Sequence, residues 1–263
     1  MWAQLVSGLG DWAGRLALSV LVYDRSQSAL WTAMVTVVSL LPWIGLGQVL
    51  ATYADRFGRV SVMVIADIAR AVLFAAMLIP QPIWSLLLLA FLAGLAVPPF
   101  AGARASTMVE VVDADHYPSS LALSGVLSQV EVLAGYAVGG IVVALIGAQT
   151  ALAVNALTFL LSALLLRRLR STSAADRHDG AEVGLRGLRA GLAVWRSDPV
   201  CQRALVLFVG VSMFMILPEV LVVPFTDEIG LSEKFVGAFA ALVAVGSIIG
   251  MVMMPKADDH VAL

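Results

Sequence analysis

The amino-acid sequence predicts an all-α membrane protein, a multi-pass helical bundle, on three observations. The chain of 263 residues is 60% hydrophobic and only 13% charged, whereas a soluble domain carries about 25% charged residues. Its mean hydropathy is +0.95, so one water-soluble core could not bury its apolar surface. Apolar runs of about 20 residues, the length that crosses about 30 Å of hydrocarbon, recur along the chain, without the alternation typical of a β-barrel.

These runs predict eight membrane-spanning helices. Polar stretches rich in turn-forming residues separate them, such as YDRSQS, DRFGR, PQP, GAQT and TDEIGLSEK. Pro98 and Pro99 predict a kink in the fourth span, because proline removes a backbone donor and clashes with the preceding turn. In order, the predicted spans are residues 5–23, 31–53, 61–79, 83–103, 120–146, 149–166, 204–225 and 235–254.

Lys and Arg residues are concentrated on one side of this topology. With the turn at residues 54–60 in the cytoplasm, twelve of the sixteen Lys and Arg residues lie on that side, against Arg25 and Lys234 on the other. Arg15 and Arg70 fall inside spans. Positively charged loops stay on the inner side of a membrane. We therefore expect a multi-pass protein of a cell membrane, the inner membrane of a bacterium, with both termini in the cytoplasm.

The one long hydrophilic segment divides the chain into three parts. Residues 1–166 form an N-terminal half of six helices, residues 167–203 a basic cytoplasmic linker, and residues 204–263 a C-terminal part with two helices. Apolar residues recur three and four apart within the linker, beside arginines. This spacing predicts an amphipathic helix on the membrane surface.

A compact charged turn follows the second predicted span. Asp55, Arg56 and Arg59 surround Gly58, which allows a tight reversal. The helix dipole favours a carboxylate near the start of the third span, and the arginines can pair with it or with lipid phosphates. An ordinary cytoplasmic turn would account for these charges.

The same turn resembles the signature between the second and third helices of major facilitator superfamily transporters, roughly Gly-x-Leu-Ala-Asp-Arg-x-Gly-Arg-Lys. Ala54, Asp55, Arg56, Gly58 and Arg59 match that signature. The stretches QLVSGLGDWAGRLALSVLVYD and VNALTFLLSALLLRRLR resemble the first and sixth helices of the branch with enterobactin-type and macrolide-type exporters. The resemblance implies that the charged turn is a gate that forms and breaks between two states of the transporter.

Members of that family have twelve helices in two six-helix halves around a central cavity. The sequence resembles the first half and the first two helices of the second. The resemblance implies a secondary active transporter of a small molecule in the lipid bilayer, with proton-coupled efflux of a drug or siderophore by alternating access. The alternatives are a non-transporting, truncated membrane fragment and an importer of a small solute.

Charged residues inside the spans are candidates for the pathway of an ion or substrate, because a charge at the bilayer centre costs about 2.5 to 3.5 kcal/mol. Asp11 and Arg15 lie four apart on the first span, and Asp67 and Arg70 three apart on the third. Each pair shares a helix face. The pairs either stabilise helix packing or place Asp11 where it binds a cationic substrate or a coupling proton.

Glu131 and Glu219 have no oppositely charged neighbour three or four residues away. An unpaired buried carboxylate is a candidate for proton coupling, although either residue could also reach water at the membrane surface. Gly135, Gly139 and Gly140 resemble the fifth-helix glycine motif of exporters. Glycines at this spacing let helix backbones approach closely.

The sequence argues against an enzyme. GLGD at residues 8–11 and Tyr-Asp at 23–24 fit the halves of an intramembrane aspartyl protease signature, whose two carboxylates must share a proton. Asp11 and Asp24 are thirteen residues apart on one helix, about 20 Å. Nucleophile, metal-ligand and phosphate-binding motifs are absent from the sequence. We expect no catalytic residue, metal, cofactor, nucleotide or nucleic acid.

Overall fold

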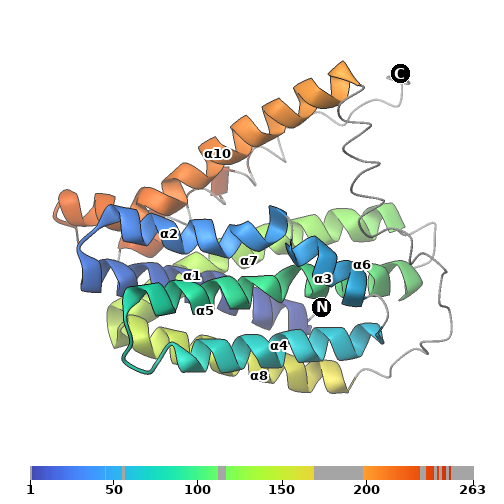
Figure 1. Cartoon of the computed structure of the whole chain (residues 1–263), viewed down its shortest axis with the longest axis horizontal. Coiled ribbons are helices and arrows are strands. Elements are labelled where there is room, and N and C mark those ends of the chain that lie inside the picture. The colour runs from blue at the N-terminus through green and yellow to red at the C-terminus, as the bar shows by residue number, and fades with distance from the viewer. Residues whose placement is uncertain are drawn as a thin grey trace.

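The computed structural model describes residues 2–44, 46–54, 57–111, 117–168, 198–231, 235–239, 242, 245, 246 and 249. Every regular element in this part of the chain is helical, which confirms the predicted all-α class (Figure 1). The elements are α1 (Trp2–Ser26), α2 (Ala29–Leu40), the 3-10 helix η1 (Leu41–Ile44), α3 (Leu46–Ala54), α4 (Arg59–Ala76), α5 (Ile83–Leu95), α6 (Val97–Val111), α7 (Tyr117–Ile146), α8 (Ala148–Arg167) and α10 (Pro199–Glu228).

Four helical segments among the described residues are long and apolar enough to cross a membrane, by length and composition. They are Leu5–Ser26, Ile83–Thr107, Leu123–Ile146 and Ala148–Arg167, at the first, fourth, fifth and sixth predicted spans. The second predicted span is interrupted by η1, and the third lies on α4, which carries Asp67 and Arg70. The seventh lies within α10, and the eighth is described only in part.

Prolines break the helices of the second and fourth predicted spans. Pro42 lies in η1, which divides the predicted span 31–53 and was not predicted. The helix before Pro98 and Pro99 is interrupted at Ala96, as predicted for a residue that cannot donate a backbone hydrogen bond. The two breaks meet at Gly47, where an added Cβ atom would lie 2.3 Å from the Pro42 carbonyl oxygen and 2.5 Å from Pro98 Cγ. Close packing of the breaks therefore requires glycine at position 47.

Helix α1 lies at the centre of the bundle and packs against α2, α7 and α8. Its residues Leu16 to Val22 are buried, and α8 also packs along α4. The outward faces of the bundle are apolar as well: Ile65, Val72 and Leu145 have exposed fractions of 64%, 61% and 71%. Apolar side chains on such faces are suited to contact lipid, as expected for a multi-pass membrane protein.

The predicted division into three parts stays a prediction. Helix α8 ends at Arg167 and α10 begins at Pro199, close to the predicted ends of the linker. The amphipathic helix predicted between them lies outside the described residues.

Candidate functional site

A buried group of charges joins α1 to α4 inside the bundle. The Arg70 guanidinium of α4 pairs with Asp11 Oδ2 of α1 at 2.7 Å, and also with Asp67 Oδ1 one turn away on its own helix. Arg70 and Asp67 are 2% and 0% exposed. Because burial removes water from these charges, they depend on one another for stabilisation.

The sequence predicted the pair of Asp67 with Arg70, which the structure confirms. It paired Asp11 with Arg15 on the same helix, whereas the structure pairs Asp11 with Arg70 on another helix. The Arg15 guanidinium carbon lies 4.6 Å from the centroid of the Trp12 ring. The candidates therefore form one group across two helices, which spacing along a single helix does not reveal.

Hydroxyl groups and aromatic rings hold this group in place. The Ser7 hydroxyl donates to Asp67 Oδ1 at 3.4 Å, and Ser162 of α8 forms a second side-chain hydrogen bond with that carboxylate. The Arg70 guanidinium lies between two rings, 4.5 Å from the Phe159 centroid and 4.8 Å from that of Phe100. Cation–π contacts of this kind strengthen when water is excluded. Arg70 and Asp67 are therefore enclosed by side chains of α1, α6 and α8.

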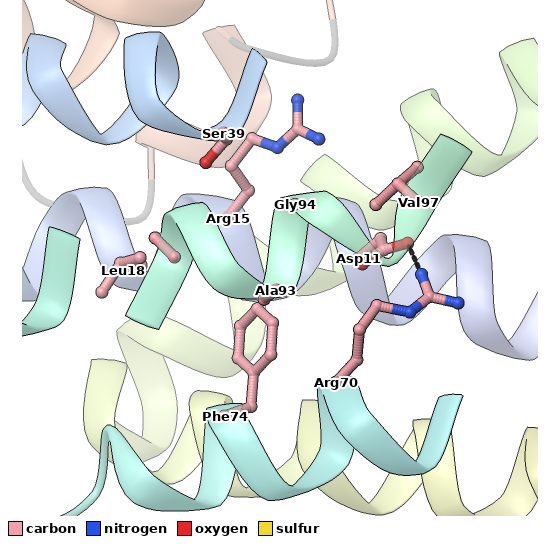
Figure 2. A pocket seen from close by; sticks show the side chains of 10 residues that line it. Asp11, Arg15, Leu18, Ser39, Arg70, Phe74, Ala93, Gly94 and Val97 are labelled. Carbon is pink, nitrogen blue, oxygen red and sulfur yellow. Dashed lines mark hydrogen bonds and ion pairs between the residues drawn. The ribbon is translucent and has the colours of Figure 1, made fainter. Parts of the chain in front are cut away.

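The two carboxylates on Arg70 differ in their access to water. Asp67 is fully buried, whereas the side chain of Asp11 is 28% exposed and lines a cavity together with Arg15, Arg70 and Phe74 (Figure 2). In Figure 2, Arg15 extends toward Ser39 of α2, while Asp11 points to Arg70. The cavity measures about 30 Å³, enough for one or two water molecules. A proton can thus reach Asp11 far more easily than Asp67.

Glycines of α1 make further close contacts with polar side chains, on α7 and α8. Glu131 of α7 is 6% exposed and faces Gly8, where an added Cβ would lie 2.5 Å from Glu131 Oε2. A Cβ atom added at Gly14 would lie 2.0 Å from Asn155 Nδ2 of α8. These glycines make room on α1 for polar side chains of its neighbours.

Asn155, which is 1% exposed, was not predicted as a site residue, and Gly8 was noted only as part of a protease signature. The signal that could have revealed both was an asparagine within an apolar span and the recurrence of glycine at positions 8, 10 and 14 of another. Small residues at such intervals permit close helix contacts.

The glycines singled out on α7 lie at its closest contacts with other helices. An added Cβ at Gly135 would lie 2.5 Å from Trp12 Cβ, and one at Gly139 would lie 2.7 Å from the backbone Cα of Ala13. At Gly140 it would lie 2.5 Å from Gly237 Cα. The backbones of α7 and α1 could not come this close with larger residues at these positions.

The predicted gate is described only in part. Asp55 and Arg56 lie outside the described residues. Gly58 precedes the first turn of α4, and Arg59 Nη1 donates to the Ser106 carbonyl oxygen at 3.1 Å, which joins the start of α4 to α6. Glu219 falls within α10, but its side chain is not among those described. The roles of these residues stay predictions.

Within the described ranges, no group of three His, Cys, Asp or Glu side chains is placed to hold a metal ion. The buried guanidinium of Arg70 instead pairs with two carboxylates, those of Asp11 and Asp67. Their arrangement suits a site at which a proton or a charged solute exchanges with an ion pair.

Comparison with known proteins gives one family across nearly the whole chain. The family model described as Major Facilitator Superfamily matches residues 1–259. Residues are 28% identical to the MFS-type transporter YfiS of Bacillus subtilis over 62% of this chain and 40% of the relative. The multidrug efflux pump Tap of Mycobacterium tuberculosis is 28% identical over 73% of this chain and 48% of the relative. Tap of Mycolicibacterium fortuitum is 26% identical over 95% of this chain and 64% of the relative. The chain thus spans less than two thirds of each relative.

Proposed function

The chain belongs to the Major Facilitator Superfamily, and on that premise we propose that it is a secondary active transporter that exports a small molecule in exchange for protons, by alternating access. Export is supported by two of the relatives, which are named multidrug efflux pumps. Without a nucleotide-binding motif in the sequence, an ion gradient is the energy source that such a transporter would use.

The observation that carries the proposal is the sharing of Arg70 between a buried carboxylate and one that lines a cavity. In the proposed cycle, a proton from the cavity neutralises Asp11 and removes its attraction for the guanidinium. Arg70 stays paired with Asp67, so its side chain keeps its position against α4. The contact between α1 and α4 weakens. A cationic substrate at Asp11 would have the same effect, so proton and substrate would compete for one carboxylate.

Proton-driven transport tests this proposal. Everted membrane vesicles that contain the full chain are given an acidic interior, and uptake of ethidium and related lipophilic cations is followed by fluorescence. We expect Asp11→Asn to lower uptake at least about a hundredfold, the lower end of the effect that loss of an acid–base group has in proton transfer. Asn keeps a hydrogen-bond acceptor for Arg70, so the protein should still reach the membrane.

The matched control is Asp24→Asn, the same change at an exposed position of the same helix, which should leave uptake unchanged. Uptake that persists after collapse of both the pH gradient and the membrane potential would contradict proton coupling. An absence of uptake for every dye, with the protein present in the membrane, would favour the non-transporting alternative.

The proposed location is the cell membrane, with the residues before α10 on the cytoplasmic side, and the single cysteine offers a test. Cys201 is exposed near the start of α10. A membrane-impermeant maleimide should label it in everted vesicles and leave it unlabelled in intact cells. Labelling from the outer side of intact cells would invert the proposed topology.

The rate of that labelling should depend on Asp198, which accepts hydrogen bonds from the Val200 amide at 2.8 Å and from Cys201 Sγ at 3.4 Å. The carboxylate raises the pKa of the Cys201 thiol, so less of the reactive thiolate is present near neutral pH. We expect Asp198→Asn to speed labelling at pH 7 and to shift the pH–rate curve toward lower pH. Because Asn caps helices as well as Asp, an unchanged curve would show that the charge has no influence.

A further inference from the structure

The C-terminal half of helix α10 lies against the bundle, whereas the N-terminal half of α10 diverges from the bundle (Figure 1). Val222, Val223 and Thr226 are 7%, 5% and 2% exposed. Toward the other end, Val206 and Leu207 are 68% and 69% exposed. The two ends of this helix therefore differ in packing, although apolar residues occur along its whole length.

Two contacts join other parts of the chain at the packed end. The Tyr23 hydroxyl, near the end of α1, donates to Asp227 Oδ2, near the end of α10, at 2.9 Å. Gly237 meets Gly140 of α7 at backbone distance, since a Cβ added at Gly237 would lie 2.6 Å from Gly140 Cα. The segment after α10 is thus also close to the first six spans at this end.

We propose that Tyr23 and Asp227 form a latch that keeps this end of the protein closed. The hydrogen bond connects residues 204 positions apart on either side of the predicted linker, and a charged acceptor makes it stronger than a neutral one. The apolar and glycine contacts beside this hydrogen bond do not depend on the orientation of a donor toward an acceptor. When the phenol and the carboxylate each turn to water, only the apolar and glycine contacts hold this end closed. Helix α10 can then tilt away and expose residues that are now buried there.

The role of the latch, to close one side of a transporter during alternating access, rests on the proposed function. Its existence is a matter of geometry, so it can be tested without substrate or gradient. The measurement needs a reporter that is buried when the end is closed and accessible when it opens. Thr226 is suitable because it is 2% exposed, lies one residue before Asp227, and bonds with its hydroxyl only to carbonyl oxygens of its own helix.

The experiment uses the full chain in native membranes with Cys201→Ser and Thr226→Cys. Modification by membrane-permeant N-ethylmaleimide is stopped at intervals, and the remaining thiol is counted by a gel shift with a polyethylene glycol maleimide. We expect Tyr23→Phe to raise the modification rate about fivefold, in proportion to the loss of one hydrogen bond. Phe keeps the ring, so the packing of α1 is preserved.

Arg25→Gln is the matched control. Arg25 Nη1 donates to the Gln81 carbonyl oxygen at 3.2 Å at the same end, but this bond stays within the first six spans. Arg25→Gln should leave the rate at position 226 unchanged. An equal rise with Arg25→Gln, or no rise with Tyr23→Phe, would overturn the latch. In chains that retain Cys201, its modification rate should not respond to Tyr23→Phe, and a parallel rise there would show general loosening instead.

Discussion

Arg70→Met is expected to prevent the protein from accumulating in a folded form. The change leaves the buried carboxylate of Asp67 without its counter-charge, and Asp11 loses the same partner. Removing one partner of a buried ion pair costs about 3 to 5 kcal/mol, a large part of a total stability of about 5 to 15 kcal/mol. The measurement is the yield of monodisperse protein by size-exclusion chromatography in detergent, together with the thermal midpoint.

Two further variants separate the charge from the shape of Arg70. Arg70→Lys keeps the charge but loses the planar group between Phe100 and Phe159 and contacts both carboxylates less well, so an intermediate thermal midpoint is expected. The triple change Arg70→Met, Asp11→Asn and Asp67→Asn removes the charges together and should restore much of the yield, because a neutral replacement of a buried ion group is well tolerated. If Arg70→Met alone were as stable as the unchanged protein, the ion group would have no structural role.

Composition and proline positions were sufficient to predict the fold class and the break in the fourth span. The all-α class, the break near Pro98, and the extent of α8 follow from apolar length and from the missing donor of proline. The same reasoning overestimated regularity elsewhere. It treated residues 31–53 as one span, whereas Pro42 lies in a 3-10 turn that divides the segment.

The candidate site was predictable in its members more than in its connections. Charges within apolar spans identified Asp11, Asp67 and Arg70, since such charges require a partner. Spacing along one helix identifies only neighbours on that helix, and it therefore could not show that Asp11 reaches Arg70 on α4. Nor could it show which carboxylate lines a cavity, because that depends on how α1, α4 and α5 pack around Phe74 and Ala93.

Gly139→Leu is expected to have the second large effect, a separation of α7 from α1. A leucine cannot avoid the backbone of Ala13, whose Cα would lie 2.7 Å from the new Cβ, and backbone cannot rotate away as a side chain can. Overpacking costs about 1 to 3 kcal/mol and occasionally more. We expect a lower thermal midpoint in detergent and less protein in the membrane.

Alanine substitutions at two glycines of α7 are expected to change the stability of the protein in opposite directions. At Gly125 an added Cβ meets nothing within 4 Å, so Gly125→Ala should stabilise the helix by up to about 1 kcal/mol, the difference in helix propensity. At Gly139 the same methyl group meets Ala13, so Gly139→Ala should destabilise the protein despite the same gain in propensity. Because helix, residue type and substitution are identical, opposite shifts of the thermal midpoint can arise only from the contact with α1. Equal shifts at the two positions would mean that α7 does not approach α1 this closely.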